Sequence, residues 1–354
     1  MAKAAEAVGH DELQSAASWQ NSMGGGNKDH DEFALPPLPA IDPASAPVQL
    51  SAEQQREYAE LGYTLCPQLI TPDEALELQA AVDEMLEQAR GLPNEHTDMF
   101  DFEATHTPDA PRVRRIKRPD IRSDPFRRLL RHPNICGAVA QLLGPNVRHQ
   151  NVKLNIKAGD YGSPVEWHQD WAFYPHTNQG VLAAAVMIDD MTEENAPMMV
   201  VPKTHLGPIY SHFTEGVFVG GMDVEQAEAE GCDFAAAHPL LGPAGSVSLH
   251  HGRAVHGSDL NRSPNPRRLV VIECIAADAW PLVDAPADLS VFENQAMFGE
   301  PISMVPRMEV APAAALPSAS DRQHLRGAAG HQEQGLRTEQ GRARAAALKQ
   351  CLGV

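Results

Sequence analysis

The sequence predicts a mainly β domain with flanking helices, in which antiparallel strands form a sandwich or a barrel. Three observations predict this class. From about residue 147 the apolar residues recur at every second position, which is the repeat of a strand. Several such short segments then follow one another without helices between them. Before residue 147 the apolar repeat is helical, so helices precede the strands.

The two ends of the chain differ in composition from its middle. Residues 1–48 contain three successive glycines at 24–26 and then five prolines. Residues 311–354 are rich in Ala, Gln, Gly and Arg and offer little apolar surface. Such compositions are typical of disordered arms and tails, so the folded domain is expected to span 49–310.

The helical part of this domain is marked by capping residues. Ser51 and Thr71 are each followed three residues later by Gln or Glu, which is the capping-box pattern at a helix start. Ser123, followed by Asp-Pro, starts a third helix. The His-Pro pair at 132–133 interrupts that helix, and its second part is expected to end at Gly144.

The twofold repeat is clearest in the first strand segment, where Val152, Leu154 and Ile156 fall on one face and Lys153 and Asn155 on the other. Seven segments are predicted to be strands: Val147–Lys157, Val165–Asp170, Val181–Asp189, Pro197–Pro202, Gly245–His250, Arg253–Gly257 and Leu269–Ile275.

The chain is acidic. It has 28 Lys and Arg residues against 47 Asp and Glu residues, and its formal net charge is −19. Affinity for phosphate backbones and for anionic membranes depends on clustered Lys and Arg, so neither nucleic acid nor a membrane is expected as a partner. Nothing in the sequence indicates an oligomeric state.

The basic residues that the chain does have gather in Arg112–Arg131, which holds nine of them. Such a run is usually a solvated face or the ion-pair partner of nearby acids, and this is the interpretation we adopt, except for Lys117. The alternative is a cluster that attracts an anionic substrate.

The five cysteines are far apart and include no Cys-x-x-Cys pair. An odd and sparse set excludes a disulfide framework and a thiolate zinc finger, and it fits a reducing compartment. The first residues of the chain lack the basic and apolar segments of a signal peptide. A cytoplasmic or other reducing intracellular location, without a signal peptide, is therefore expected.

The motif that points to chemistry is His168-Gln169-Asp170. On a strand, residues two apart project to the same side, so His168 and Asp170 are expected to lie next to each other. Two histidines and one carboxylate, with the other positions open, form the facial triad of non-haem Fe(II) oxygenases. In a chain with 16 histidines and 47 acids, however, a His-x-Asp pair alone is weak support for a metal site.

A third metal ligand is expected near the end of the strand region. His256 is followed 11 residues later by Arg267, and His251 is followed by Arg262 at the same spacing. We prefer the first pair because Arg267 opens an apolar strand, whereas Arg262 sits inside a turn rich in Pro and Asn. An arginine at the start of that strand offers a two-pronged donor to the distal carboxylate of a dicarboxylate cosubstrate.

Together, the segment around His168-Gln-Asp170, the HGSxxNxS motif at 256–263 and Arg267 resemble the phytanoyl-CoA dioxygenase family of Fe(II)/2-oxoglutarate oxygenases. The resemblance covers about 51–285. It implies a double-stranded β-helix, a cupin-like jelly-roll core with helices packed outside.

The resemblance also implies roles for individual residues. Fe(II) is expected on His168, Asp170 and His256, with 2-oxoglutarate and O2 as cosubstrates. The C5-carboxylate of 2-oxoglutarate is expected on Arg267. The residues expected to make further cosubstrate contacts are Ser258, Lys153 and Lys117, and Val186 is expected at a position of the cosubstrate wall that some relatives fill with an aromatic residue.

The function implied is a dioxygenase that hydroxylates a small organic substrate and releases succinate and CO2. The alternative is a non-enzymatic jelly-roll protein that binds a small ligand or a structural metal. A halogenase is set aside because those relatives replace the carboxylate ligand, and Asp170 is present. For Trp171 and Phe173, beside the motif, a hydrophobic substrate wall and ordinary core packing are equally expected.

Overall fold

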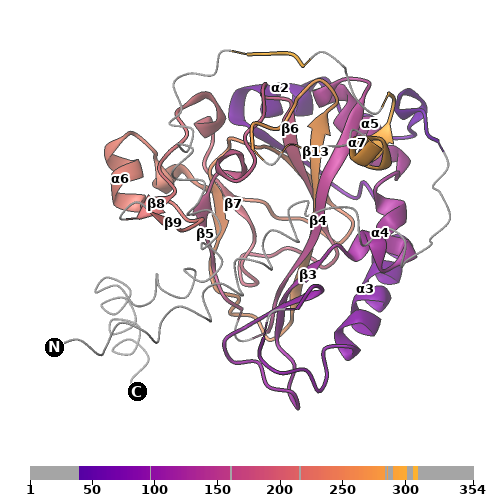
Figure 1. Cartoon of the computed structure of the whole chain (residues 1–354), viewed down its shortest axis with the longest axis vertical. Coiled ribbons are helices and arrows are strands. Elements are labelled where there is room, and N and C mark those ends of the chain that lie inside the picture. Colours follow the sequence, from indigo (N-terminus) through magenta and orange to yellow (C-terminus); the bar gives the residue numbers. More distant parts are fainter. Residues whose placement is uncertain are drawn as a thin grey trace.

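The computed structural model describes residues 40–95, 97–159, 162–214, 217–283, 285, 290–300 and 306–309. Within them, two antiparallel sheets lie against each other, and the helices α3, α4 and α5 lie along the outer side of the larger sheet (Figure 1). No helix in these ranges is long and apolar enough to cross a bilayer.

The order of the strands is that of a jelly roll. Eight strands of the core divide so that β11-β6-β13-β4 lie next to one another in one sheet and β10-β7-β12-β5 form the other. The larger sheet consists of β1 (Tyr63–Cys66), β11 (Val247–His251), β6 (Val181–Met187), β13 (Arg267–Ala276), β4 (Val147–Lys157), β3 (Val113–Lys117), β2 (Phe100–Phe102) and β14 (Ala296–Phe298). The smaller sheet consists of β10 (His238–Pro239), β7 (Met199–Val200), β12 (His256–Ser258) and β5 (Val165–His168). The predicted fold class is confirmed.

The helices begin where their capping residues stand. Ser51 and Thr71 each form a complete capping box, and Gly144 takes the C-cap position after α5. The helices are α2 (Ala52–Leu61), α3 (Pro72–Glu87), α4 (Asp124–Leu129), α5 (Pro133–Leu143), α6 (Val224–Ala229) and α7 (Ser290–Asn294), and β8 (Phe213–Thr214) with β9 (Val217–Phe218) forms a separate hairpin.

The two faces of the larger sheet bury different residues. In β13, Val270 and Ile272 pack in the cluster that includes the helices, whereas Leu269 and Val271 pack in the space between the sheets. Because side chains alternate along a strand, Arg267 shares the second face, and polar residues on that face point into the barrel.

Several strands were missed or given the wrong ends. The predicted strand Val165–Asp170 ends at His168, and Val181–Asp189 ends at Met187. Short strands such as β1 and β3 were not predicted, because four or five residues with polar side chains on one face carry too weak an apolar repeat.

The start of the folded domain lies before residue 49. Residues 43–45 form a 3-10 helix against α5, Ala46 is buried, and the Val48 N–H donates to Asn134 Oδ1 at 3.1 Å. This part of the segment predicted to be a disordered arm is therefore folded. Residues 1–39 and 310–354 lie outside the described residues, so the predictions for the two ends stay predictions.

Buried neutral histidines make stability depend on pH. Burial lowers the pKa of His149 to about 4 and that of His176 to about 3, whereas an exposed histidine titrates near 6.5. Between these values the unfolded chain binds more protons than the folded one, so stability is fully present above the unfolded pKa and falls as the pH decreases.

We therefore expect the free energy of unfolding, measured with urea, to fall between about pH 6.5 and pH 5 by up to about 1.4 kcal/mol per pH unit for each histidine. His149→Gln keeps a donor for the Gln295 carbonyl, which His149 Nδ1 meets at 2.8 Å, and should lower the slope. An unfolding free energy that stays constant or increases over this range would contradict the assignment.

Candidate metal centre

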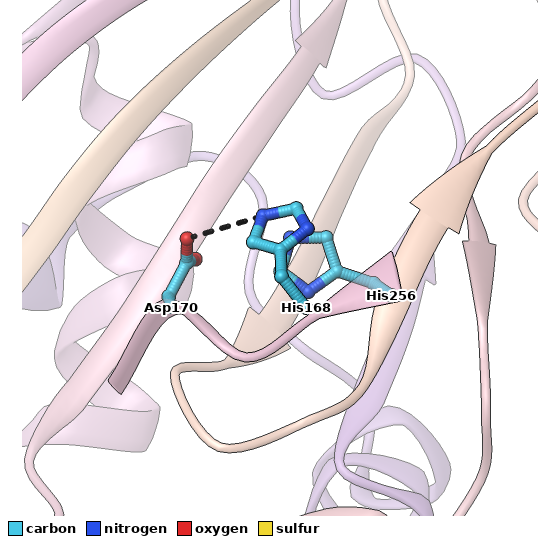
Figure 2. A group of neighbouring side chains, drawn as sticks. All are labelled: His168, Asp170 and His256. Carbon is cyan, nitrogen blue, oxygen red and sulfur yellow. Dashed lines mark ion pairs between the residues drawn. The ribbon is translucent and has the colours of Figure 1, made fainter. Parts of the chain in front are cut away.

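The three predicted metal ligands meet between the two sheets. His168 is the last residue of β5, and His256 opens β12 directly opposite it in the sheet register. Asp170 begins the 3-10 helix Asp170–Ala172, two residues beyond the end of β5. Figure 2 shows the two imidazole rings side by side, with the Asp170 carboxylate facing them. The expected neighbourhood is present, although Asp170 reaches it from a turn and not from a strand.

One ligand atom of each residue lies within 4.8 Å of the others, and His168 Nε2 is 3.8 Å from Asp170 Oδ1. His168 Nδ1 lies 2.8 Å from the carbonyl of Glu166, and His256 Nδ1 lies 3.0 Å from that of Ala254. A carbonyl only accepts, so both Nδ1 atoms carry the proton and both Nε2 lone pairs are free for a metal. This donor set fits a ferrous ion.

The charges of the site also suit metal binding, which requires neutral imidazoles and an ionised carboxylate. Burial lowers the pKa of His168 and holds that of His256 well below its usual range. Burial alone would raise the pKa of Asp170, but the neighbouring His250, His256 and Lys153 hold it well below the usual value.

Gln169, between two of the ligands, fixes the turn that carries them. Its side chain donates to the carbonyls of Pro208 (3.1 Å) and Arg253 (2.7 Å) and accepts the Tyr210 N–H (2.9 Å). Its own backbone N–H donates to His212 Nε2 at 2.9 Å. The sequence interpretation missed this role, because the partners lie up to 84 residues away.

Arg267 points into the barrel, as its spacing predicts. It is 2% exposed, and its Nη2 donates to the Ala196 carbonyl at 2.6 Å. Its Nε makes no hydrogen bond within the described residues. Burial lowers the pKa of Arg267 only to about 10, so the guanidinium stays charged at neutral pH, and its Nε can donate to an anionic acceptor.

The alternative arginines point elsewhere. Arg268 faces outward, where its Nη2 meets Asp189 Oδ1 at 2.6 Å. The side chain of Arg262 is 68% exposed and pairs with Asp259. His251, the alternative ligand, is buried and accepts the Arg253 N–H at Nδ1 (3.0 Å). The register that pairs His251 with Arg262 therefore places no guanidinium inside the barrel.

Lys157 is a buried lysine that the sequence interpretation missed. It stands directly opposite Arg267 in the β4–β13 register and is 2% exposed. Its Nζ donates to the carbonyls of Ser163 (2.8 Å) and Asp259 (2.5 Å). Burial, and then the charge of Arg267, lower the pKa of Lys157 to about 6. The alternation along β4 signals this position, since Lys157 follows Lys153 on the same face.

The two predicted lysines are cross-strand partners. Lys117 on β3 stands opposite Lys153 on β4. Lys153 Nζ lies 3.0 Å from Glu273 Oε1, and Lys117 Nζ lies 3.2 Å from Asp101 Oδ1. Each lysine therefore already has an acidic partner within the protein.

Among the other predicted residues, Ser258 is 9% exposed and lies two residues after His256 on β12. Trp171 is 4% exposed and packs in a buried cluster with Tyr174. Phe173 is partly buried, and its ring stands edge-on to that of His168, 5.8 Å between centroids. Phe173, unlike Trp171, borders the metal centre.

The expectation for Val186 is wrong. Val186 packs in the cluster that includes the helices, whereas Ala183, Ala185 and Met187 on the same strand face the space between the sheets. The prediction placed Val186 on the wrong face of β6. Every residue of this strand is apolar and buried, so the sequence does not distinguish its two faces.

The basic cluster Arg112–Arg131 forms ion pairs in several places. Arg115 and Lys117 share Asp101, and Arg128 meets Glu77 at 2.6 Å. These contacts agree with the interpretation of the cluster as partners of nearby acids.

Comparison with known proteins agrees with this geometry. The family model described as "Phytanoyl-CoA dioxygenase (PhyH)" matches residues 58–269, more than half of the chain. The chain belongs to the phytanoyl-CoA dioxygenase family. The predicted family and the predicted enzyme class, a 2-oxoglutarate-dependent dioxygenase, are thereby confirmed.

Proteins similar in sequence to this chain include a "Probable alpha-ketoglutarate-dependent hypophosphite dioxygenase" of Stutzerimonas stutzeri. It is 36% identical over 234 residues, which are 66% of this chain and 81% of the relative. An ectoine dioxygenase of Bordetella parapertussis is 28% identical over 237 residues, 62% of this chain and 73% of the relative.

Among solved structures, EctD from S. alaskensis with 2-oxoglutarate and 5-hydroxyectoine resembles this chain with a TM-score of 0.53 at 22% identity. The match covers 77% of this chain and 94% of that one. At this identity the resemblance supports the shared fold of the family.

Proposed function

We propose that the protein uses Fe(II), held by His168, Asp170 and His256, together with 2-oxoglutarate and O2 to hydroxylate a small organic substrate. The observation that carries the proposal is the pairing of a three-ligand centre, with both Nε2 lone pairs free, with a buried arginine that has an unpaired Nε. When bound, iron and 2-oxoglutarate supply the oxidising power for hydroxylation, and succinate and CO2 are released.

The residues of the chain bind and orient. Arg267 holds the C5-carboxylate of 2-oxoglutarate, with Ser258 on β12 as a further donor. Lys157 stands opposite Arg267, and a bound carboxylate favours its protonated form. Lys153 and Lys117, which stand opposite each other, bind the other carboxylate of 2-oxoglutarate or an acidic group of the substrate. The charge of Lys153 also lowers the pKa of Asp170. Phe173 forms one edge of the substrate site and helps to exclude water.

The substrate is proposed to be small and polar. The relatives named for hypophosphite and for ectoine support this size and polarity.

The four described cysteines are buried and free, which supports a reducing intracellular compartment.

Succinate release tests the proposal. The purified full chain, with Fe(II), ascorbate and 2-oxoglutarate, is expected to release succinate faster when the right member of a panel of small polar and anionic substrates is added. The Arg268→Leu variant, changed on the outer face, is the matched control and should keep this response. If no substrate in a broad panel raises succinate above the rate without protein, the non-enzymatic jelly-roll alternative is favoured.

A further inference from the structure

His250 is a buried histidine whose ring is not held by the protein. It lies on β11, is 1% exposed, and neither ring nitrogen makes a hydrogen bond within the described residues. By contrast, His168, His212 and His256 each donate Nδ1–H to the carbonyl two residues earlier. A buried polar group without a partner is costly, so the ring is expected to gain a partner when the site is filled.

The metal ligand Asp170 offers an acceptor close to this ring. His250 Nε2 lies 3.6 Å from Asp170 Oδ2, whereas His168 Nε2 lies 3.8 Å from Oδ1. The two carboxylate oxygens thus face different neighbours. A hydrogen bond of about 2.9 Å requires the two groups to approach by well under 1 Å. The neighbour of His250 on β6 is Ala183, whose side chain ends at Cβ, and its neighbour on β1 is Tyr63.

His250 stands beside the metal centre and is not one of its ligands. Among the described residues, the ligand atoms that lie within 4.8 Å of one another belong to His168, Asp170 and His256, and this group does not include His250. The ring of His250 is 4.5 Å from that of His256, between centroids.

We propose that His250 is a positioning residue that donates its Nε2–H to Asp170 Oδ2 when a metal is bound on the other carboxylate oxygen. The proposal rests on the proposed function. Held in this way, the carboxylate binds the metal through one oxygen, which leaves positions open for 2-oxoglutarate and O2. Partners of this kind typically change metal affinity by about 10- to 100-fold.

The test is an anaerobic titration of the full chain with Fe(II) alone, followed by calorimetry. His250→Phe is expected to raise the Kd for Fe(II) by about 10- to 100-fold. His250→Gln, whose amide can donate from near the position of Nε2, should restore most of the affinity, whereas the shorter His250→Asn should not.

Ser248→Ala is the matched control. Ser248 lies on the same face of β11, is fully buried, and its Oγ also makes no hydrogen bond within the described residues. It stands beside Ala185 in the register, two residues along β11 from His250, so its loss should leave the Kd unchanged. The metal-free Phe variant should melt no lower than the parent chain, because it removes unpaired polar atoms.

Two outcomes overturn the inference: Fe(II) binding by His250→Phe as tight as by the parent chain, or a loss that Gln and Asn variants share equally. If the Phe variant does not fold, the comparison of Gln with Asn decides. If the parent chain itself binds no Fe(II), the proposed function fails and this inference fails with it, which is a distinct result.

Discussion

Alanine in place of His168, Asp170 or His256 is expected to abolish both Fe(II) retention and 2-oxoglutarate turnover. Each residue supplies one of three protein ligands, and the ligand atoms lie within 4.8 Å of one another. Residues that merely orient a ligand are worth about 10- to 100-fold in metal affinity, so losing a ligand should cost more than about 100-fold. The measurement is anaerobic Fe(II) binding, with succinate release as the second readout.

His238→Ala is the matched control for the metal ligands, because His238 is exposed and lies on β10 of the same sheet. It should bind Fe(II) as the parent chain does. Wild-type Fe(II) affinity in any two of the three ligand variants would show that the metal is held elsewhere.

Arg267→Leu is expected to raise the Kd and KM for 2-oxoglutarate greatly while Fe(II) affinity stays near normal. The guanidinium is buried with an unpaired Nε, so its loss leaves the C5-carboxylate desolvated beside Lys157 alone. Truncating one partner of such a pair costs on the order of 2–5 kcal/mol, or roughly 30- to several-thousand-fold in affinity. Arg267→Lys should rescue only partly, since a lysine lacks the planar pair of donors.

The neighbouring arginines give the controls for cosubstrate binding. Arg268→Leu removes an outward ion pair with Asp189, and Arg262→Leu changes an exposed side chain. Neither should change the KM for 2-oxoglutarate. A large cosubstrate defect in Arg262→Leu with a normal Arg267→Leu would reverse the assignment and move the third ligand to His251.

Local sequence signals predicted the parts of the fold that depend on local chemistry. The capping boxes at Ser51 and Thr71 placed two helix starts correctly, and β4 has the predicted bounds, Val147–Lys157. The weakly patterned strands β1 and β3 depend on pairing with distant strands, so their four or five residues gave no usable signal.

The candidate site was predicted in its main residues and missed in its supports. His168 and Asp170 lie close together as the twofold repeat predicted. The strand, however, ends at His168, and Asp170 lies in a 3-10 helix and not in the predicted strand. The positions of His250 and Lys157 follow from the registers β11–β6 and β4–β13, which pair residues about 70 to 110 positions apart. Spacing along the chain does not encode such contacts.

The most direct measurement is an anaerobic crystal structure of the full chain with Fe(II) and 2-oxoglutarate, with the metal located by anomalous scattering. We expect one iron peak, bound by Nε2 of His168, Nε2 of His256 and one oxygen of Asp170. The C5-carboxylate of 2-oxoglutarate is expected on the Arg267 guanidinium. An iron peak away from these three residues, or a C5-carboxylate bound at Lys117 and Lys153 with Arg267 left unpaired, would contradict these assignments.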